Sequence, residues 1–288
     1  MNTKTIDRRQ FLQSGLMAAA LAASGKLPLL SAESSVDSGI DAATGPYAVK
    51  PIRDYLSRFL PAQTPLGQKQ QYSLTYDIIH WHWKAGERST FANTIVGQIS
   101  IKKERQNNRA MYDISQQTTI GGVNNFIEAQ ITCHADALGS LSHWLLHSYE
   151  QSLDGEAGRL SELTEQGTCR DGRIQVDSGN YRYQFEAENP IVTQWTVPDL
   201  LIRKESPQLS VMFDLLQDLS LFKPNQSLVY DGQTSVRLKD GNTVTLQTYA
   251  QIGQGVLPIH YLLDAEGRPQ LITSSILSWA LSGQQNLA

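Results

Sequence analysis

Residues 72–83 read YSLTYDIIHWHW, and this stretch decides the fold class. From Tyr72 to His82 every second residue is large and mostly apolar, which is the repeat of a strand that buries one face. Similar alternating runs, separated by Gly, Asn and Asp turn signals, continue nearly to the C-terminus. The pattern therefore predicts a mainly β fold made of antiparallel strands.

The turn signals divide the alternating region into two sets of expected strands. The first set covers residues 72–83, 91–103, 109–119, 123–134, 142–152, 159–168, 173–178 and 181–187, and the second covers 227–238, 243–252, 257–263 and 270–280. Consecutive hairpins dominate, and no strand–helix–strand rhythm is present. We expect an antiparallel curved sheet, half-barrel or barrel-like, in a single β-rich domain over residues 51–288.

Two segments have the apolar spacing of a helix. Residues 206–222 begin with Ser-Pro, a typical helix start, and place on one face Leu209, Met212, Phe213, Leu216 and Leu219. This segment is predicted to be a helix that covers the concave face or one open end of the sheet. A short N-terminal helix is predicted over residues 52–60, ending before Pro61, with an apolar stripe formed by Ile52, Tyr55, Leu56, Phe59 and Leu60.

The N-terminus has the pattern of a twin-arginine export signal. Arg8 and Arg9 precede Phe11 and Leu12, and a mild Ala-rich run follows at residues 15–23. We expect a cleaved signal peptide over residues 1–32 and a flexible leader over 33–50. The mature domain is then periplasmic, the twin-arginine translocase is a partner, and no stable membrane span is expected because polar and Pro residues interrupt the apolar run.

Composition excludes several classes of protein. The 288 residues are 40% hydrophobic, and 24 basic residues face 28 acidic ones. A chain of this size can bury a core without help from metals or disulfides. Its acidic balance gives no field that would attract nucleic acid. Cys133 and Cys169 can pair in an oxidising compartment, and two unconnected thiols are the alternative.

A concentration of histidines is the most suggestive chemical feature. Five of the six His lie between residues 80 and 147. His80 and His82 share the apolar face of their strand, and two such imidazoles can bind zinc when a third ligand comes from a neighbouring strand. The alternatives are histidines that bridge core and solvent at a sheet rim, and ligand contact without a metal.

No motif for a catalytic nucleophile or for a known cofactor is present. The chain contains no GxSxG elbow, no GxGxxG after a strand, no phosphate-binding P-loop and no CxxCH. No cofactor is therefore indicated, and an enzyme is the less favoured reading.

The C-terminal part resembles uncharacterised, twin-arginine-exported bacterial periplasmic β-domain families of unknown function. The residues that carry the resemblance are Leu219–Pro224, Leu228–Gly232 and Gly253–Pro269, with a looser match at Leu74–Asp77. The resemblance implies the fold and the compartment and transfers no catalytic residue. Within it, Asp264–Arg268 is read as a tight turn in which Gly267 has positive φ and the Asp264 side chain bonds the turn.

The leading functional hypothesis is a non-enzymatic β-domain that binds a hydrophobic or amphipathic ligand, or an envelope protein, in its concave face. The residues expected to line that face are Tyr76, Ile78, His80, His82, Met212 and Phe213. One alternative is a metal-assisted hydrolase that uses His80 and His82. The other is a structural subunit of an exported complex, with the helix at 52–60 as its contact.

Overall fold

The computed structural model of the chain describes residues 47–66, 71–83, 91–153, 158–204, 210–238 and 240–287. Backbone contacts divide the chain into two units, Met1–Ile40 and Asp41–Ala288, and all the described residues belong to the second. The export signal, and residues 33–46 of the expected leader, lie outside the described residues.

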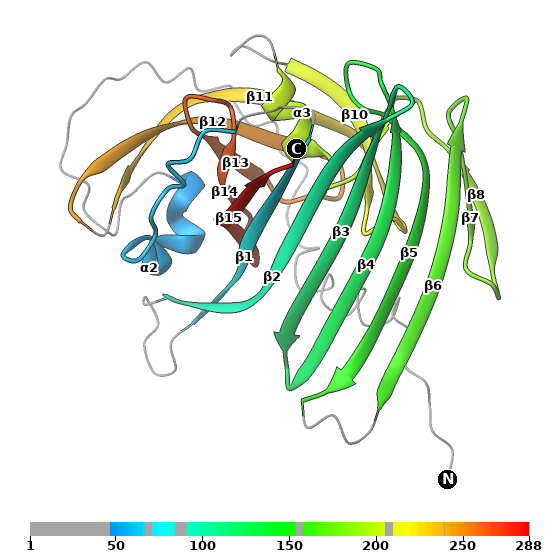
Figure 1. Ribbon diagram of the computed structural model, residues 1–288, viewed down its shortest axis with the longest axis horizontal. Coiled ribbons are helices and arrows are strands. Elements are labelled where there is room, and N and C mark those ends of the chain that lie inside the picture. The colour runs from blue at the N-terminus through cyan, green and yellow to red at the C-terminus, as the bar shows by residue number, and fades with distance from the viewer. Residues whose placement is uncertain are drawn as a thin grey trace, which may run out of the picture. The chain divides into compact units, whose positions relative to one another are not determined.

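The first half of the described chain forms eight strands joined in succession. They are β1 (Tyr72–Trp83), β2 (Phe91–Gln106), β3 (Arg109–Ile120), β4 (Val123–His134), β5 (Leu141–Ser152), β6 (Arg159–Arg170), β7 (Arg173–Asp177) and β8 (Arg182–Glu186). Each pairs antiparallel with the next, as the alternating pattern predicts (Figure 1). The mainly β fold is confirmed, and most of these strand boundaries lie within three residues of the predicted ones.

The second half returns to the start of the sheet. Its strands are β9 (Ile191–Val192), β10 (Ser210–Gln217), β11 (Leu221–Arg237), β12 (Thr243–Gly253), β13 (Ile259–Leu263), β14 (Pro269–Thr273) and β15 (Leu277–Asn286). The last strand, β15, pairs with β1, so one 15-stranded sheet runs from β8 through β1 and β15 to β9. It is mixed, because β9 and β10 are parallel. The expected strand 270–280 is two strands, β14 and β15.

The sheet is not closed into a barrel, because no ladder joins its edge strands β8 and β9 in the described residues. Its two ends are nevertheless close. The Phe185 ring of β8 lies 4.9 Å from the Phe222 ring of β11, measured between centroids. The buried Asp214 carboxylate of β10 accepts the backbone N–H groups of Glu188 and Asn189, each at 3.1 Å. Residues 187–190, called the β8–β9 link below, are thereby fastened to β10.

The helix predicted over residues 206–222 is wrong where the structure describes it. Residues 210–217 are the strand β10, and residues from Leu221 onward belong to β11. A short apolar run fits both the helical and the strand period, and pairing with β9 and β11 decides between them here. The helix that does exist nearby is α3 (Val197–Arg203), which has Pro198 in its first turn.

The N-terminal helix is shorter than predicted. A 3-10 helix, η1 (Tyr47–Ile52), leads into the single-turn α2 (Arg53–Leu56). Four residues of the predicted stripe are buried, whereas Leu60 is exposed. Residues 47–50, expected in the leader, are part of this element: Ala48 and Val49 are buried, and the Thr273 hydroxyl donates to the Ala48 carbonyl oxygen.

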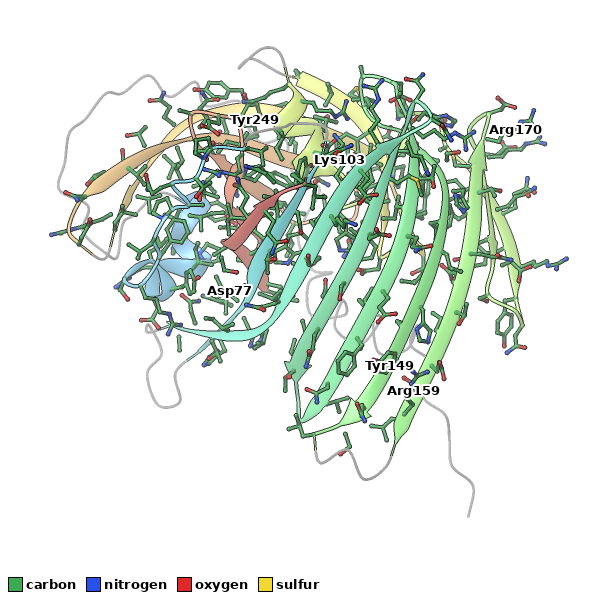
Figure 2. All side chains as sticks on the ribbon, viewed as in Figure 1. Asp77, Lys103, Tyr149, Arg159, Arg170 and Tyr249 are labelled. Carbon is green, nitrogen blue, oxygen red and sulfur yellow. The ribbon has the colours of Figure 1, made fainter. Side chains whose placement is uncertain are left out.

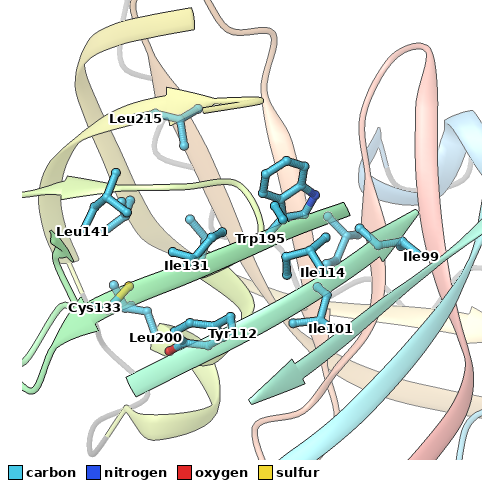
Figure 3. Close-up of a cluster of buried hydrophobic side chains, with 14 of the residues drawn as sticks. Ile99, Ile101, Tyr112, Ile114, Ile131, Cys133, Leu141, Trp195, Leu200 and Leu215 are labelled. Atoms are coloured by element: carbon cyan, nitrogen blue, oxygen red, sulfur yellow. The ribbon is translucent and has the colours of Figure 1, made fainter. Parts of the chain in front are cut away.

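Two hydrophobic cores lie on opposite faces of the sheet. The larger, core A, contains α3 and side chains from strands in both halves, among them Ile101, Leu200 and Leu215 (Figure 3). Its β1 residues include Tyr72, Tyr76 and Ile78. The smaller, core B, packs η1 and α2 against Ile79 and side chains of β11 to β15. Successive residues of β1 therefore enter different cores, which is the alternation read from residues 72–83.

The Asp264–Arg268 turn is confirmed. Gly267 has φ +82°, and the Asp264 Oδ1 atom accepts the backbone N–H groups of Glu266 and Arg268, each at 3.0 Å. The buried Arg268 guanidinium contacts the Asp264 carboxylate at 2.8 Å and donates to the Ala62 carbonyl oxygen at 2.8 Å. The motif is thus a structural clamp that holds the segment after α2 on the sheet.

Candidate functional site

The residues predicted to line a ligand site on the concave face are divided between the interior and the surface of the protein. Tyr76 and Phe213 are fully buried in core A, where the Tyr76 hydroxyl donates to the Pro269 carbonyl oxygen at 3.1 Å. Met212 is 56% exposed and is not part of that core. Tyr76 and Phe213 are therefore packed interior residues rather than the walls of an open cavity.

His80 and His82 stack on each other near the end of β1. Their ring centroids are 5.7 Å apart, with an angle of 21° between the rings. Burial, followed by the neighbouring His82, lowers the pKa of His80. Across the ranges that the structure describes, no three His, Cys, Asp or Glu residues gather closely enough to hold a metal ion. These ranges supply no third ligand to the pair.

Both cysteines are free thiols. Strand β5 lies between the strands that carry Cys133 and Cys169, so their Cα atoms are roughly two strand spacings, ~10 Å, apart. A disulfide requires a Cα separation below about 7 Å. Burial raises the pKa of both thiols, and the nearby carboxylates of Asp199 and Asp171 add to the shifts of Cys133 and Cys169 respectively. Neither thiol is poised as a nucleophile.

A pocket of about 730 Å³ lies at one end of strands β3 to β6. Its walls are the ends of these strands, the turn between β6 and β7, residues of the β4–β5 loop, and the β8–β9 link. The end of β6 that carries Arg170 borders the pocket, and Arg159 lies at the opposite end of that strand (Figure 2). Apolar side chains in the lining are Leu141, Ala187, Pro190 and Ile191.

Four basic side chains from neighbouring strands line this pocket, and we call them the basic row: Arg109, His134, His143 and Arg170. Arg109 of β3 lies directly opposite His134 of β4. All four are exposed, and each adjoins in sequence a residue that packs in or against core A, namely Ala110, Cys133, Trp144 and Cys169. Strand alternation therefore turns the basic row toward the face opposite core A.

The β4–β5 loop is held by Asp136. Its carboxylate accepts the backbone N–H groups of Leu138 and Ser140, each at 3.0 Å, together with the Ser140 hydroxyl. Burial raises the pKa of Asp136, but these hydrogen bonds lower it by more, so the pKa lies below its ordinary value. The Arg203 guanidinium also reaches the loop and donates to the Ala137 carbonyl oxygen at 3.3 Å. This wall of the pocket is therefore fixed from two sides.

Arg203 joins the pocket to a buried polar group in core A, the Asp199 cluster: Asp199, Tyr72, Lys103, Tyr112 and Arg203. Asp199 of α3 accepts four hydrogen bonds, from the Lys103 Nζ atom at 2.5 Å, Arg203 Nε at 2.6 Å, and the hydroxyls of Tyr72 at 2.7 Å and Tyr112 at 2.8 Å. The carboxylate is thereby saturated. The cluster fixes α3 to β1, β2 and β3.

The cluster residues have shifted proton affinities. Burial, followed by the Asp199 carboxylate, raises the pKa of Tyr72 and of Tyr112 well above the usual range of tyrosine. Burial lowers the pKa of Lys103, and Asp199 opposes that shift. Sequence reasoning missed this cluster, because Tyr72 and Asp199 are 127 positions apart.

The basic row was visible only in part from the sequence. The concentration of histidines included His134 and His143, but no pattern singled out Arg109 or Arg170, whose place beside them depends on strand register.

None of the helices in the described ranges is long and apolar enough to cross a membrane.

Comparisons with known proteins find a distant structural likeness. No known family and no curated protein matches the chain. Among solved structures, the chain is similar to the crystal structure of a DUF1089 family protein from Pseudomonas aeruginosa, with 14% sequence identity and a TM-score of 0.34, over 66% of this chain and 93% of that one.

Proposed function

We propose that this protein is a non-enzymatic binding protein that holds a small amphipathic ligand in the pocket at the ends of β3 to β6. The observation that carries the proposal is the pocket itself. Its volume of about 730 Å³ lies within the range of small-molecule sites, roughly 300–1,000 Å³. The basic row offers polar contacts, and the half-buried Ala187 and the exposed Pro190 offer apolar ones.

The fold supports a site at the rim rather than in the middle of the sheet. We propose that the sheet is a half-barrel-like scaffold whose interior is filled by core A, with α3 as its covering helix. Trp195, Leu200 and Leu201 are buried there, and Phe185 and Phe222 bring the two ends of the sheet together. Because the interior is filled, a ligand can bind only at the rim of the sheet. There Asp136 holds the β4–β5 loop and Asp214 holds the β8–β9 link, and both segments are walls of the pocket.

We further propose that the protein is exported by the twin-arginine route and binds its ligand in the periplasm. Arg8, Arg9, Phe11 and Leu12 support this, through the pattern described above. Replacing both arginines with lysine in the full chain should leave the protein in the cytoplasm. Fractionation of cells that express the two forms measures this, and equal periplasmic amounts would contradict the export proposal.

The binding proposal is tested by filling the pocket. Thr168 is exposed and lines the pocket, whereas Thr164 is exposed on the same face of β6 and lies outside the lining. Thr168→Trp in the full chain should abolish binding of n-octyl phosphate, measured by calorimetry, and Thr164→Trp should leave it intact. Equal binding by both variants, or no binding of any octyl compound by the unaltered protein, would overturn the proposal.

A further inference from the structure

We infer that the pocket recognises an anionic headgroup, a phosphate or a carboxylate, with Arg109 as its main anchor and His134 as the neighbouring donor. This inference rests on the proposed function, since it names the chemistry of the ligand that the pocket would take. It follows from where the charges lie, which of them are already paired, and which strands present them.

Arg109 is the cation in the pocket that folding leaves unused. In the part of the chain that the structure describes, its guanidinium has no ion pair and no side-chain hydrogen bond. Arginines outside the pocket on the same half of the sheet differ. Arg173 lies 3.4 Å from the Glu186 carboxylate, and Arg182 lies 2.8 Å from that of Asp177. An unpaired guanidinium in a pocket is a ready donor for an oxyanion.

Two of the three acidic residues in the lining have a partner within the protein. Formal charges do not favour an anion by themselves, because two arginines face Asp136, Asp171 and Glu188. The Asp136 carboxylate, however, bonds its own loop, and that of Asp171 lies 3.6 Å from Arg170. Glu188 belongs to the β8–β9 link, apart from the strand ends that carry the basic row. The strand ends are therefore the side of the pocket that attracts an anion.

The register limits how many basic residues one headgroup can reach. Neighbouring strands are spaced at about 4.8 Å, so a row from β3 to β6 extends over roughly 14 Å, longer than one phosphate group. Arg109 and His134 are direct cross-strand partners. Together they can present a guanidinium fork and an imidazole N–H to the same oxyanion. His143 and Arg170 then flank the site rather than form it.

The test measures binding of matched probes to the full chain by calorimetry. The probes are n-octyl phosphate, sodium octanoate, 1-octanol and inorganic phosphate. We expect both anionic octyl compounds to bind more tightly than octanol. Arg109→Gln should weaken the binding of octyl phosphate by about tenfold, which corresponds to the loss of one charge-assisted hydrogen bond. It should leave the affinity for octanol unchanged. Arg109→Lys should restore part of the affinity, because charge returns without the fork.

Arg182→Gln is the matched control, since it removes an equal charge from the same sheet outside the pocket and should leave octyl phosphate binding unchanged. Equal affinity for octanol and octyl phosphate, together with no effect of Arg109→Gln, would overturn the headgroup inference while the proposed function stood. Binding of no octyl compound would remove both. Inorganic phosphate binding as tightly as octyl phosphate would support the anion site and contradict an amphipathic ligand.

Discussion

The Asp199 cluster and the basic row contain the same kinds of group, yet the fold uses them in opposite ways. In the cluster, the buried Lys103 and the half-buried Arg203 both face one carboxylate that accepts four hydrogen bonds. In the basic row, four exposed side chains surround a pocket, and Arg109 has no counter-ion in the described ranges. One set of charges is consumed by folding, and the other is available to a ligand.

The difference shows that burial, rather than residue type, separates structural charges from binding charges. A charge removed from water must find partners within the protein, and the free energy of that pairing then belongs to folding. A charge at a rim keeps its hydration and can exchange water for a ligand. Arg203 links the Asp199 cluster to the pocket, because it bonds Asp199 on one side and the β4–β5 loop on the other.

The largest effect is expected from Asp199→Ala, which breaks the buried side of this comparison. The change leaves Lys103 buried without its carboxylate and frees two buried hydroxyls. The free energy of unfolding should fall by about 3–5 kcal/mol, measured by urea denaturation. Glu186→Gln, which breaks the exposed pair with Arg173, should leave the urea midpoint unchanged. Similar losses in both variants would mean that burial does not separate the two kinds of charge.

Alkaline pH should weaken the same cluster. The folded-state pKa values of Tyr72 and Tyr112 are raised, so their contribution to stability is complete below the unfolded value of about 10 and is lost as the pH rises above it. Lys103 acts in the opposite direction. Because its folded-state pKa is lowered, its contribution to stability rises with pH, and this rise ends near the unfolded-state pKa of about 10.4.

Above pH 10.5 the tyrosines therefore dominate. Each should reduce the free energy of unfolding by about 1.4 kcal/mol per pH unit. Urea titrations between pH 10.5 and 11.5 measure this slope, and Tyr112→Phe should make it shallower. A slope that Tyr112→Phe leaves unchanged would show that the cluster hydroxyls do not carry the effect.

A glycine pair tests the link between the two regions. Gly139 has φ +63°, and a Cβ there would lie 2.9 Å from the Arg203 Nη2 atom, whereas Gly121 has φ +64° with nothing within 4 Å. Both alanine variants should lose about 1–2 kcal/mol of stability from left-handed backbone strain. Only Gly139→Ala should also weaken octyl phosphate binding in calorimetry, because it displaces Arg203 beside the pocket. Equal binding by the two variants would separate Arg203 from the site.

The smallest effect is expected from Glu188→Gln. Removing this exposed carboxylate from the pocket lining should strengthen octyl phosphate binding by roughly two- to fivefold at low salt. The gain should shrink at 1 M salt, because screening shortens the reach of exposed charges. Unchanged or weaker binding at low salt would show that the Glu188 carboxylate does not repel the bound headgroup.

Prediction from sequence was most accurate where structure is local. The strands β1 and β4 have the predicted bounds, because alternation and the adjoining turn residues encode a hairpin within a few positions. The region from 206 to 222 was predicted as a helix, since its apolar residues fit both periods. Pairing of β10 with β9 and β11 supplies the deciding energy there, and those partners cannot be read from the segment itself.

The site followed the same division. His134 and His143 are visible in the sequence as members of a histidine concentration, whose pattern favours His80 and His82 as the candidate site. Arg109 carried no sequence signal, because its place opposite His134 and beside the pocket depends on register and on the β8–β9 link. The Asp199 cluster was equally hidden, as its partners come from three strands and a helix far along the chain.

The sequence alone determined the β-rich class, the succession of hairpins and the turn chemistry at Asp264–Arg268, because periodicity and turn preference act over a few neighbouring residues. Tertiary structure decided the rest: β15 pairing with β1, α3 entering core A, and a pocket forming where strand ends meet the β8–β9 link. Those outcomes depend on contacts between segments many residues apart, whose free energies exist only once the sheet has assembled.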